Sequence, residues 1–245
     1  MSKKEQAVNS TTAPLANVAA CMRALEIAMK RHQHLPGIVA FYGDSGWGKT
    51  ISAAYAANHY RAYYVEVKSS WHKKALLQAI LVEMGVAPRG TVPELTDQVA
   101  EHLVLSGRPL IIDEFDALVN RNLVEIVRDI YEASNAPILI IGEERLEVNL
   151  RRWERFHNRV LDWVPAQPAS LADAKHLRTL YCQRAKVADD LLARIQEVTR
   201  ANARRICINL ERAQELASQE HWKEIDLAKW GDREFYTGEA PQRRA

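Results

Sequence analysis

The chain has few of the residues that mark a secreted or metal-binding protein. Its 245 residues include only three cysteines, Cys21, Cys182 and Cys207, and no C-x-x-C pair. An odd number of scattered cysteines is typical of free thiols in a reducing compartment and argues against a disulfide framework or a cysteine zinc site. The histidines form no H-E-x-x-H motif, which excludes that kind of zinc site as well.

The chain also lacks long apolar runs and a strong net charge. No stretch approaches the ~18 uninterrupted apolar residues of a membrane span, and no apolar run follows the charged amino terminus. We therefore expect a cytoplasmic protein with no membrane partner. A net charge of +2 permits nucleic-acid binding without arguing for it, and 47% apolar residues are ordinary for a globular protein.

Short apolar runs alternate with helical patterns through the first two thirds of the chain. This alternation predicts an α/β fold, with a five-stranded parallel sheet and helices on both of its faces. The predicted strands are residues 38–42, 62–67, 108–113, 136–142 and 159–164.

The composition changes at the sequence PAQPAS, residues 165–170, and every later segment has a helical pattern. We therefore predict four parts. They are a disordered arm (1–14), an α/β nucleotide-binding domain (15–165), a small helical domain (166–232) and a flexible tail (233–245). The helix predicted for residues 15–30 has an apolar face of Val18, Met22, Leu25, Ile27 and Met29.

A glycine-rich segment directly after the first predicted strand matches G-x-x-x-x-G-K-[ST]. It consists of Gly43, Asp44, Ser45, Gly46, Trp47, Gly48, Lys49 and Thr50. The glycines let successive backbone N–H groups form an anion-binding nest, and the following helix presents its positive end to the same phosphates. Lys49 offers a charge to the β- and γ-phosphates, and Thr50 a hydroxyl to Mg²⁺. A chance glycine turn is disfavoured by the strand before and the helix after.

A pair of carboxylates ends the third predicted strand, in the sequence PLIIDEFD. In P-loop proteins a carboxylate at this place holds Mg²⁺, and the next acid can polarise the attacking water. Asp113 takes the first role and Glu114 the second. Asp116 is expected to cap the following turn, with a helper role in the site as the alternative. The alternative is an ordinary charged strand end.

Two further groups of residues are candidates for catalysis. Glu143, after the fourth predicted strand, stands where a water-positioning residue would lie, with a surface loop as the alternative. Five arginines fall within residues 145–159, and one supplied by a neighbouring subunit could stabilise charge on the γ-phosphate. Arg159 is the first choice and Arg155 the second, against a solvated basic helix face.

These motifs resemble those of the AAA+ ATPases. The similarity covers residues 15–215 and comprises GDSGWGKT, LIIDEFD, IIGEE, ERFHNRV and ANARRICINLERA, in the family's order. It implies ATP and Mg²⁺ as cofactors, ATP hydrolysis to ADP and phosphate, and a C-terminal helical lid. It further implies that Arg159 is a finger acting on a neighbouring subunit's nucleotide and that Arg204 is the lid arginine.

Residues 14–50 look like the target-selecting ATPases of Mu-like phages, the transposition protein B family. The resemblance implies a helical or ring oligomer on duplex DNA, with little sequence preference, that delivers target DNA to a transposase in a bacterial or phage-infected cell. Two positions depart from the pattern. Glu143 replaces the usual neutral residue, and Ala201 stands where relatives often have glycine.

Without a helix-turn-helix motif, DNA contacts are expected from the ATPase body. The sequence KSSWHKK, after the second predicted strand, supplies Lys68, Trp71, Lys73 and Lys74 for phosphate contacts. A solvated helix start is the alternative. Two other functions stay open. They are a helper or loader ATPase, of the helicase-loader or secretion type, that acts on a protein, and a nucleotide-gated switch with negligible hydrolysis.

Overall fold

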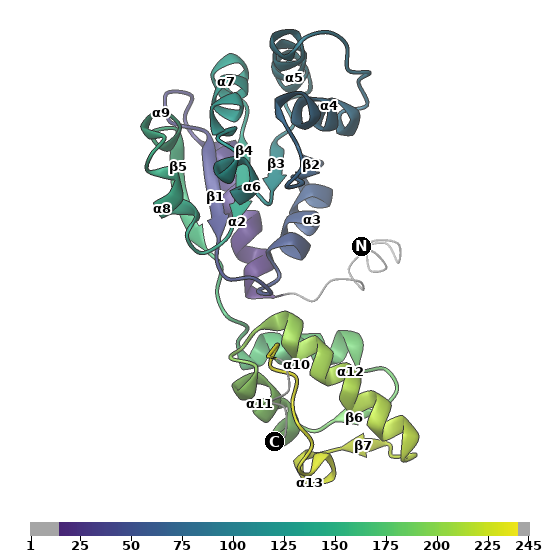
Figure 1. The fold of residues 1–245 in the computed structure, drawn as a ribbon. Coiled ribbons are helices and arrows are strands. Elements are labelled where there is room, and N and C mark those ends of the chain that lie inside the picture. Colours follow the sequence, from purple (N-terminus) through teal and green to yellow (C-terminus); the bar gives the residue numbers. More distant parts are fainter. Residues whose placement is uncertain (1–14, 240–245) are drawn as a thin grey trace, which may run out of the picture. The chain divides into compact units, whose positions relative to one another are not determined.

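The structure is a computed structural model that describes residues 15–239. The arm predicted for residues 1–14 and the end of the tail, residues 240–245, lie outside the described residues. The chain forms two compact units (Figure 1). The larger comprises residues 17–45 and 49–166, and the smaller contains residues 167–239.

The larger unit alternates strands with helices along the chain. Its elements are α2 (Ala16–Lys30), β1 (Ile38–Tyr42), α3 (Lys49–Tyr60), β2 (Tyr63–Glu66), α4 (Lys73–Glu83), α5 (Val92–Ser106), β3 (Leu110–Asp113), α6 (Asp116–Asn120), α7 (Val124–Ser134), β4 (Ile138–Gly142), α8 (Leu146–Leu150), α9 (Glu154–His157) and β5 (Val160–Pro165).

The five strands form one sheet in the order β2-β3-β4-β1-β5, and every neighbouring pair is parallel. The predicted α/β fold with a five-stranded parallel sheet is therefore confirmed. Strand β1 has the predicted bounds, and each of the other strands differs from its predicted bounds by one or two residues at one or both ends. Because β4 lies between β3 and β1, the carboxyl ends of these three strands meet at one edge of the sheet.

The two faces of the sheet are covered by different helices. Ile38, Ala40 and Ile112 belong to a core cluster that includes most of the buried residues of α4, α5 and α7. Val39 and Ile111 alternate with them and are fully buried on the opposite face. Helix α3 packs against β2 and β3 and has no residue in that cluster, so it covers the opposite face.

Helix α2 buries Val18 and Leu25 of the predicted apolar face, but its buried face is otherwise shifted from the predicted one. Its buried residues include the small side chains Cys21, Ala24 and Ala28, whereas Met29 is 38% exposed. The prediction gave weight to large apolar side chains, but small residues allow the helix backbone to approach its neighbours closely.

The smaller unit contains helices and one short sheet. Its elements are α10 (Leu171–Tyr181), β6 (Lys186–Val187), α11 (Asp189–Val198), α12 (Ala203–Gln219), β7 (Glu224–Ile225) and α13 (Leu227–Trp230). The parallel pair of β6 and β7 was not expected, because strands of two residues have no periodic pattern. Between residues 15 and 239, no helix has the length and apolar character needed to cross a bilayer.

Residues 233–239, within the predicted tail, make specific contacts in the smaller unit. The Phe235 ring stacks on Trp230, with 4.9 Å between ring centroids. The Tyr236 N–H donates to Oδ1 of the buried Asn209 at 2.8 Å, and the Asn209 amide donates to the Tyr236 carbonyl at 2.9 Å. This part of the chain is therefore held against α12.

Candidate nucleotide-binding site

The predicted phosphate loop leaves the carboxyl end of β1 and leads into α3 at Lys49. Gly46 and Gly48 have φ values of 83° and 82°, in the left-handed region that side chains other than glycine disfavour. Gly43 is buried, and its N–H donates to the Gly142 carbonyl at 3.3 Å, which ties the loop to β4. The sequence thus supplies glycine at the two positions where the loop needs it.

The Lys49 ammonium lies against the loop that precedes it. It donates to the carbonyls of Gly43 at 2.6 Å and Asp44 at 2.9 Å. Burial lowers the pKa of Lys49, and the charges of Asp113 and Glu143 act against that shift. A partly buried cation near these carboxylates would gain from an incoming phosphate.

Asp113 is buried at the carboxyl end of β3, with 2% of its surface exposed. Its Oδ1 accepts the Glu114 N–H at 2.8 Å, and its Oδ2 accepts the Tyr64 hydroxyl at 2.9 Å. Tyr64 comes from β2, the neighbour of β3 at the sheet edge. Sequence reasoning missed Tyr64, because only the order of the strands brings it beside Asp113.

Glu114 has a backbone conformation that is unusual for its residue type. Its φ is 56°, in the left-handed region, and its side chain is exposed. Such a turn lets consecutive acids point in different directions, Asp113 into the protein and Glu114 outward. Partial desolvation of the Glu114 carboxyl group beside the sheet, and then the Asp113 and Glu143 charges, raise its pKa, which suits a proton acceptor.

Glu143 follows β4 and is exposed, and its main chain is bonded to the turn after β3. Its N–H donates to Oδ2 of Asp116 at 2.6 Å. Gly142 leaves room for this contact, because a Cβ at that position would lie 2.4 Å from the same oxygen. Asp116 therefore does more than begin α6, since it connects the loops that follow β3 and β4.

This bond gives a prediction about stability. Asp116→Ala should lower the free energy of unfolding by about 1.5–3 kcal/mol, the range for hydrogen bonds to charged groups. Asp116→Asn keeps an oxygen acceptor and should recover most of that loss. Urea unfolding of the two variants measures the difference. Equal losses in both variants would contradict the assigned bond.

Arg159 lies at the amino ends of the parallel strands, whereas the phosphate loop lies at their carboxyl ends. It precedes β5, and its carbonyl accepts the N–H of Ile38, the first residue of β1. Strand β5 has six residues, and at about 3.3 Å per residue Arg159 lies roughly 20 Å from the carboxyl edge. Within one chain, the structure does not bring Arg159 to the phosphate loop.

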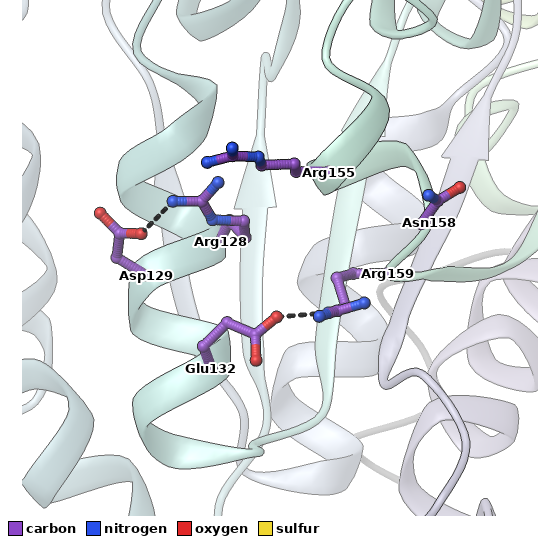
Figure 2. Close-up of a pocket in the computed structure, with 6 residues that line it drawn as sticks. All are labelled: Arg128, Asp129, Glu132, Arg155, Asn158 and Arg159. Atoms are coloured by element: carbon purple, nitrogen blue, oxygen red, sulfur yellow. Dashed lines mark hydrogen bonds and ion pairs between the residues drawn. The ribbon is translucent and has the colours of Figure 1, made fainter.

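Arg159 forms part of a charged surface cavity of about 390 Å³ between α7 and the α9–β5 segment (Figure 2). Arg159 pairs with Glu132, and Arg128 pairs with Asp129 at 2.7 Å. Arg155, the second candidate, lines the same cavity. In this cavity, carboxylates of α7 thus partly neutralise Arg159 and Arg128.

The remaining predicted residues lie on other elements. Arg204 is exposed in the first turn of α12, in the smaller unit. Lys68, Lys73 and Lys74 are exposed between β2 and the start of α4, whereas Trp71 packs partly against the hydrophobic core. The exposed part of the basic segment is therefore its lysines.

The sheet order, the glycine loop and the strand-end carboxylates define a P-loop nucleotide-binding protein. Residues 31–150 match the family model described as AAA domain. These residues are therefore similar to an AAA domain, and the chain has the fold of the AAA+ ATPases. No curated protein sequence matches it.

Solved structures of three other proteins share this fold. Cdc6p from Pyrobaculum aerophilum is 16% identical with a TM-score of 0.66, over 92% of this chain and 68% of its own. The Aeropyrum pernix ORC1 protein in complex with DNA is 17% identical with a TM-score of 0.63, over 89% and 64%. The Thermotoga maritima RuvB Holliday junction branch migration motor is 18% identical with a TM-score of 0.59, over 89% and 67%.

AAA+ ATPases use ATP with Mg²⁺, in agreement with the predicted cofactors. The residues of this chain fit that pair. The two glycines with positive φ allow main-chain N–H groups to face phosphate, and Lys49 supplies a cation beside them. The Thr50 hydroxyl and the Asp113 carboxylate are hard oxygen ligands of the kind that Mg²⁺ prefers.

Proposed function

We propose that the protein is a DNA-dependent ATPase that assembles on duplex DNA when it binds ATP and disassembles after hydrolysis. In this proposal it delivers target DNA to a transposase. The observation that supports ATP hydrolysis best is the meeting of the phosphate loop, Asp113 and Glu114 at one sheet edge.

In the proposed reaction, the loop N–H groups and Lys49 bind and orient the triphosphate. Thr50 and Asp113 would hold Mg²⁺, which neutralises charge that develops on the phosphates. Glu114 accepts a proton from the water that attacks the γ-phosphate, and Glu143 helps to position that water. The loop of residues 43–48 before Lys49 needs no side-chain chemistry, because its main-chain N–H groups would bind the phosphates.

The proposal assigns Arg159 to the nucleotide of a neighbouring subunit. Its distance of roughly 20 Å along β5 from its own carboxyl edge supports action between subunits rather than within one chain. An oligomer, helical or ring-shaped, then completes each site with an arginine from the next copy. Arg204 is proposed to act on the nucleotide from the helical lid.

Similar structures and exposed lysines support the DNA part of the proposal. One similar structure is described as in complex with DNA, and another as a Holliday junction branch migration motor. Lys68, Lys73 and Lys74 are exposed and offer three positive charges to phosphates. The transposase partner is proposed from the sequence motifs alone.

Duplex DNA of arbitrary sequence should accelerate ATP turnover by the purified protein. The acceleration should fall between low and high salt, because each lysine–phosphate contact releases counterions. ATPase assays and gel shifts at two salt concentrations measure both effects. Replacing Lys68, Lys73 and Lys74 together by alanine should weaken the shift, whereas Lys175→Ala, in the smaller unit, is the matched control. If the rate of ATP turnover did not change when DNA was added, the result would favour a helper ATPase that acts on a protein partner.

A further inference from the structure

A tyrosine on the edge strand contacts the carboxylate that is proposed to hold the metal. The half-buried Tyr64 hydroxyl lies 2.9 Å from Oδ2 of Asp113. In the register of β2 and β3, Tyr64 is opposite Ile111 and Glu66 is opposite Asp113. The contact therefore crosses the strands diagonally, on the face of the sheet that α3 covers.

The two donors leave Asp113 with acceptor capacity to spare. An ionised carboxylate has about four lone-pair sites. The Glu114 N–H occupies one site on Oδ1 and the Tyr64 hydroxyl one on Oδ2. A donor on each oxygen fixes the rotation of the carboxylate about its Cβ–Cγ bond, and one site on each oxygen stays available for a metal-bound water or for the metal.

We propose that Tyr64 is a positioning residue that orients Asp113 for Mg²⁺. In this role Tyr64 acts through the Asp113 carboxylate and not on the nucleotide or the reacting atoms. This inference rests on the proposed ATP function and adds a residue of β2 to that site. Outer-shell partners of this kind change metal affinity by about 10–100-fold when they are removed.

The adjacent tyrosine provides a matched control. Tyr63 is buried on the other face of β2, and its hydroxyl lies 3.1 Å from Nε2 of His102 on α5. Tyr63→Phe and Tyr64→Phe each remove one hydroxyl and one hydrogen bond from the same strand. Only Tyr64→Phe removes a contact to Asp113, so the pair separates a site effect from a general effect on the fold.

The experiment measures the affinity for a fluorescent ATP analogue in excess EDTA and then across a Mg²⁺ titration. In EDTA, Tyr64→Phe should bind the analogue as the wild type does. The Mg²⁺ concentration that gives half of the metal-dependent gain in affinity should rise about tenfold. Tyr63→Phe should match the wild type in both conditions. In an Asp113→Ala background, Tyr64→Phe should add less than about a twofold change.

Two outcomes would overturn the role of Tyr64. One is an unchanged Mg²⁺ response in Tyr64→Phe, and the other is an equal shift in Tyr63→Phe. In both, nucleotide binding by the wild type would leave the proposed ATP function intact. A wild-type protein that binds no nucleotide would instead refute the proposed function and this inference with it.

Discussion

Replacing Lys49 with alanine should weaken ATP binding by about 100-fold, which is the loss expected when a charge-assisted contact to phosphate is removed. The ammonium already lies against the loop carbonyls of Gly43 and Asp44. No other cation is bonded there among the described residues. Calorimetric titration with ATP and Mg²⁺ measures the change.

The fold should survive this substitution. Burial lowers the pKa of Lys49, which means that burying the charged ammonium group costs free energy in the folded protein. Because the substitution removes this cost together with the contacts of Lys49, the free energy of unfolding should change by less than about 1 kcal/mol. Lys30→Ala is the control, because Lys30 is an exposed lysine that pairs with Glu26 on the surface of α2. Normal ATP affinity in Lys49→Ala would remove the phosphate-loop assignment.

Replacing Glu114 with glutamine should keep ATP binding and lower turnover by about 100-fold or more, the range for removal of a general base. Glutamine has the same shape and can hold the same backbone turn, but it cannot accept the proton. One negative charge also disappears near the triphosphate, so affinity should stay equal or rise. Single-turnover hydrolysis, with binding measured separately, makes the test.

Two neighbouring acids make this test specific. Glu143→Gln should reduce turnover less than Glu114→Gln, because the bond that fixes the loop after β4 uses the main chain of Glu143. Glu144→Gln, at an exposed position next to it, should have no effect. If Glu143→Gln removed turnover while Glu114→Gln retained it, the two roles would have to be exchanged.

The sequence predicted the sheet because its strands are short apolar runs that end at recognisable turns. Residues 38–42 and the glycines after them carry both signals at once, and β1 has the predicted bounds. The phosphate loop and Asp113 could be proposed for the same reason, since each is a chemical motif placed directly after a strand. Local patterns of this kind survive in the folded chain.

Other features depend on packing that the sequence does not display. Tyr64 is one of two adjacent tyrosines, and only the pairing of β2 with β3 distinguishes it from Tyr63. The bond between Asp116 and the Glu143 main chain depends on β4 lying beside β3. In α2 the large side chains of Val18 and Leu25 are buried as predicted, but small side chains make up much of the rest of the buried face, which a pattern of large apolar residues does not display.

The most direct test of the central claim is a crystal structure of the protein with Mg²⁺ and a nonhydrolysable ATP analogue. The triphosphate should lie along the main-chain N–H groups of residues 43–48, with Lys49 at its β- and γ-phosphates. The metal should lie between Thr50 and Asp113. An analogue bound elsewhere, or a metal with neither residue near it, would contradict the account.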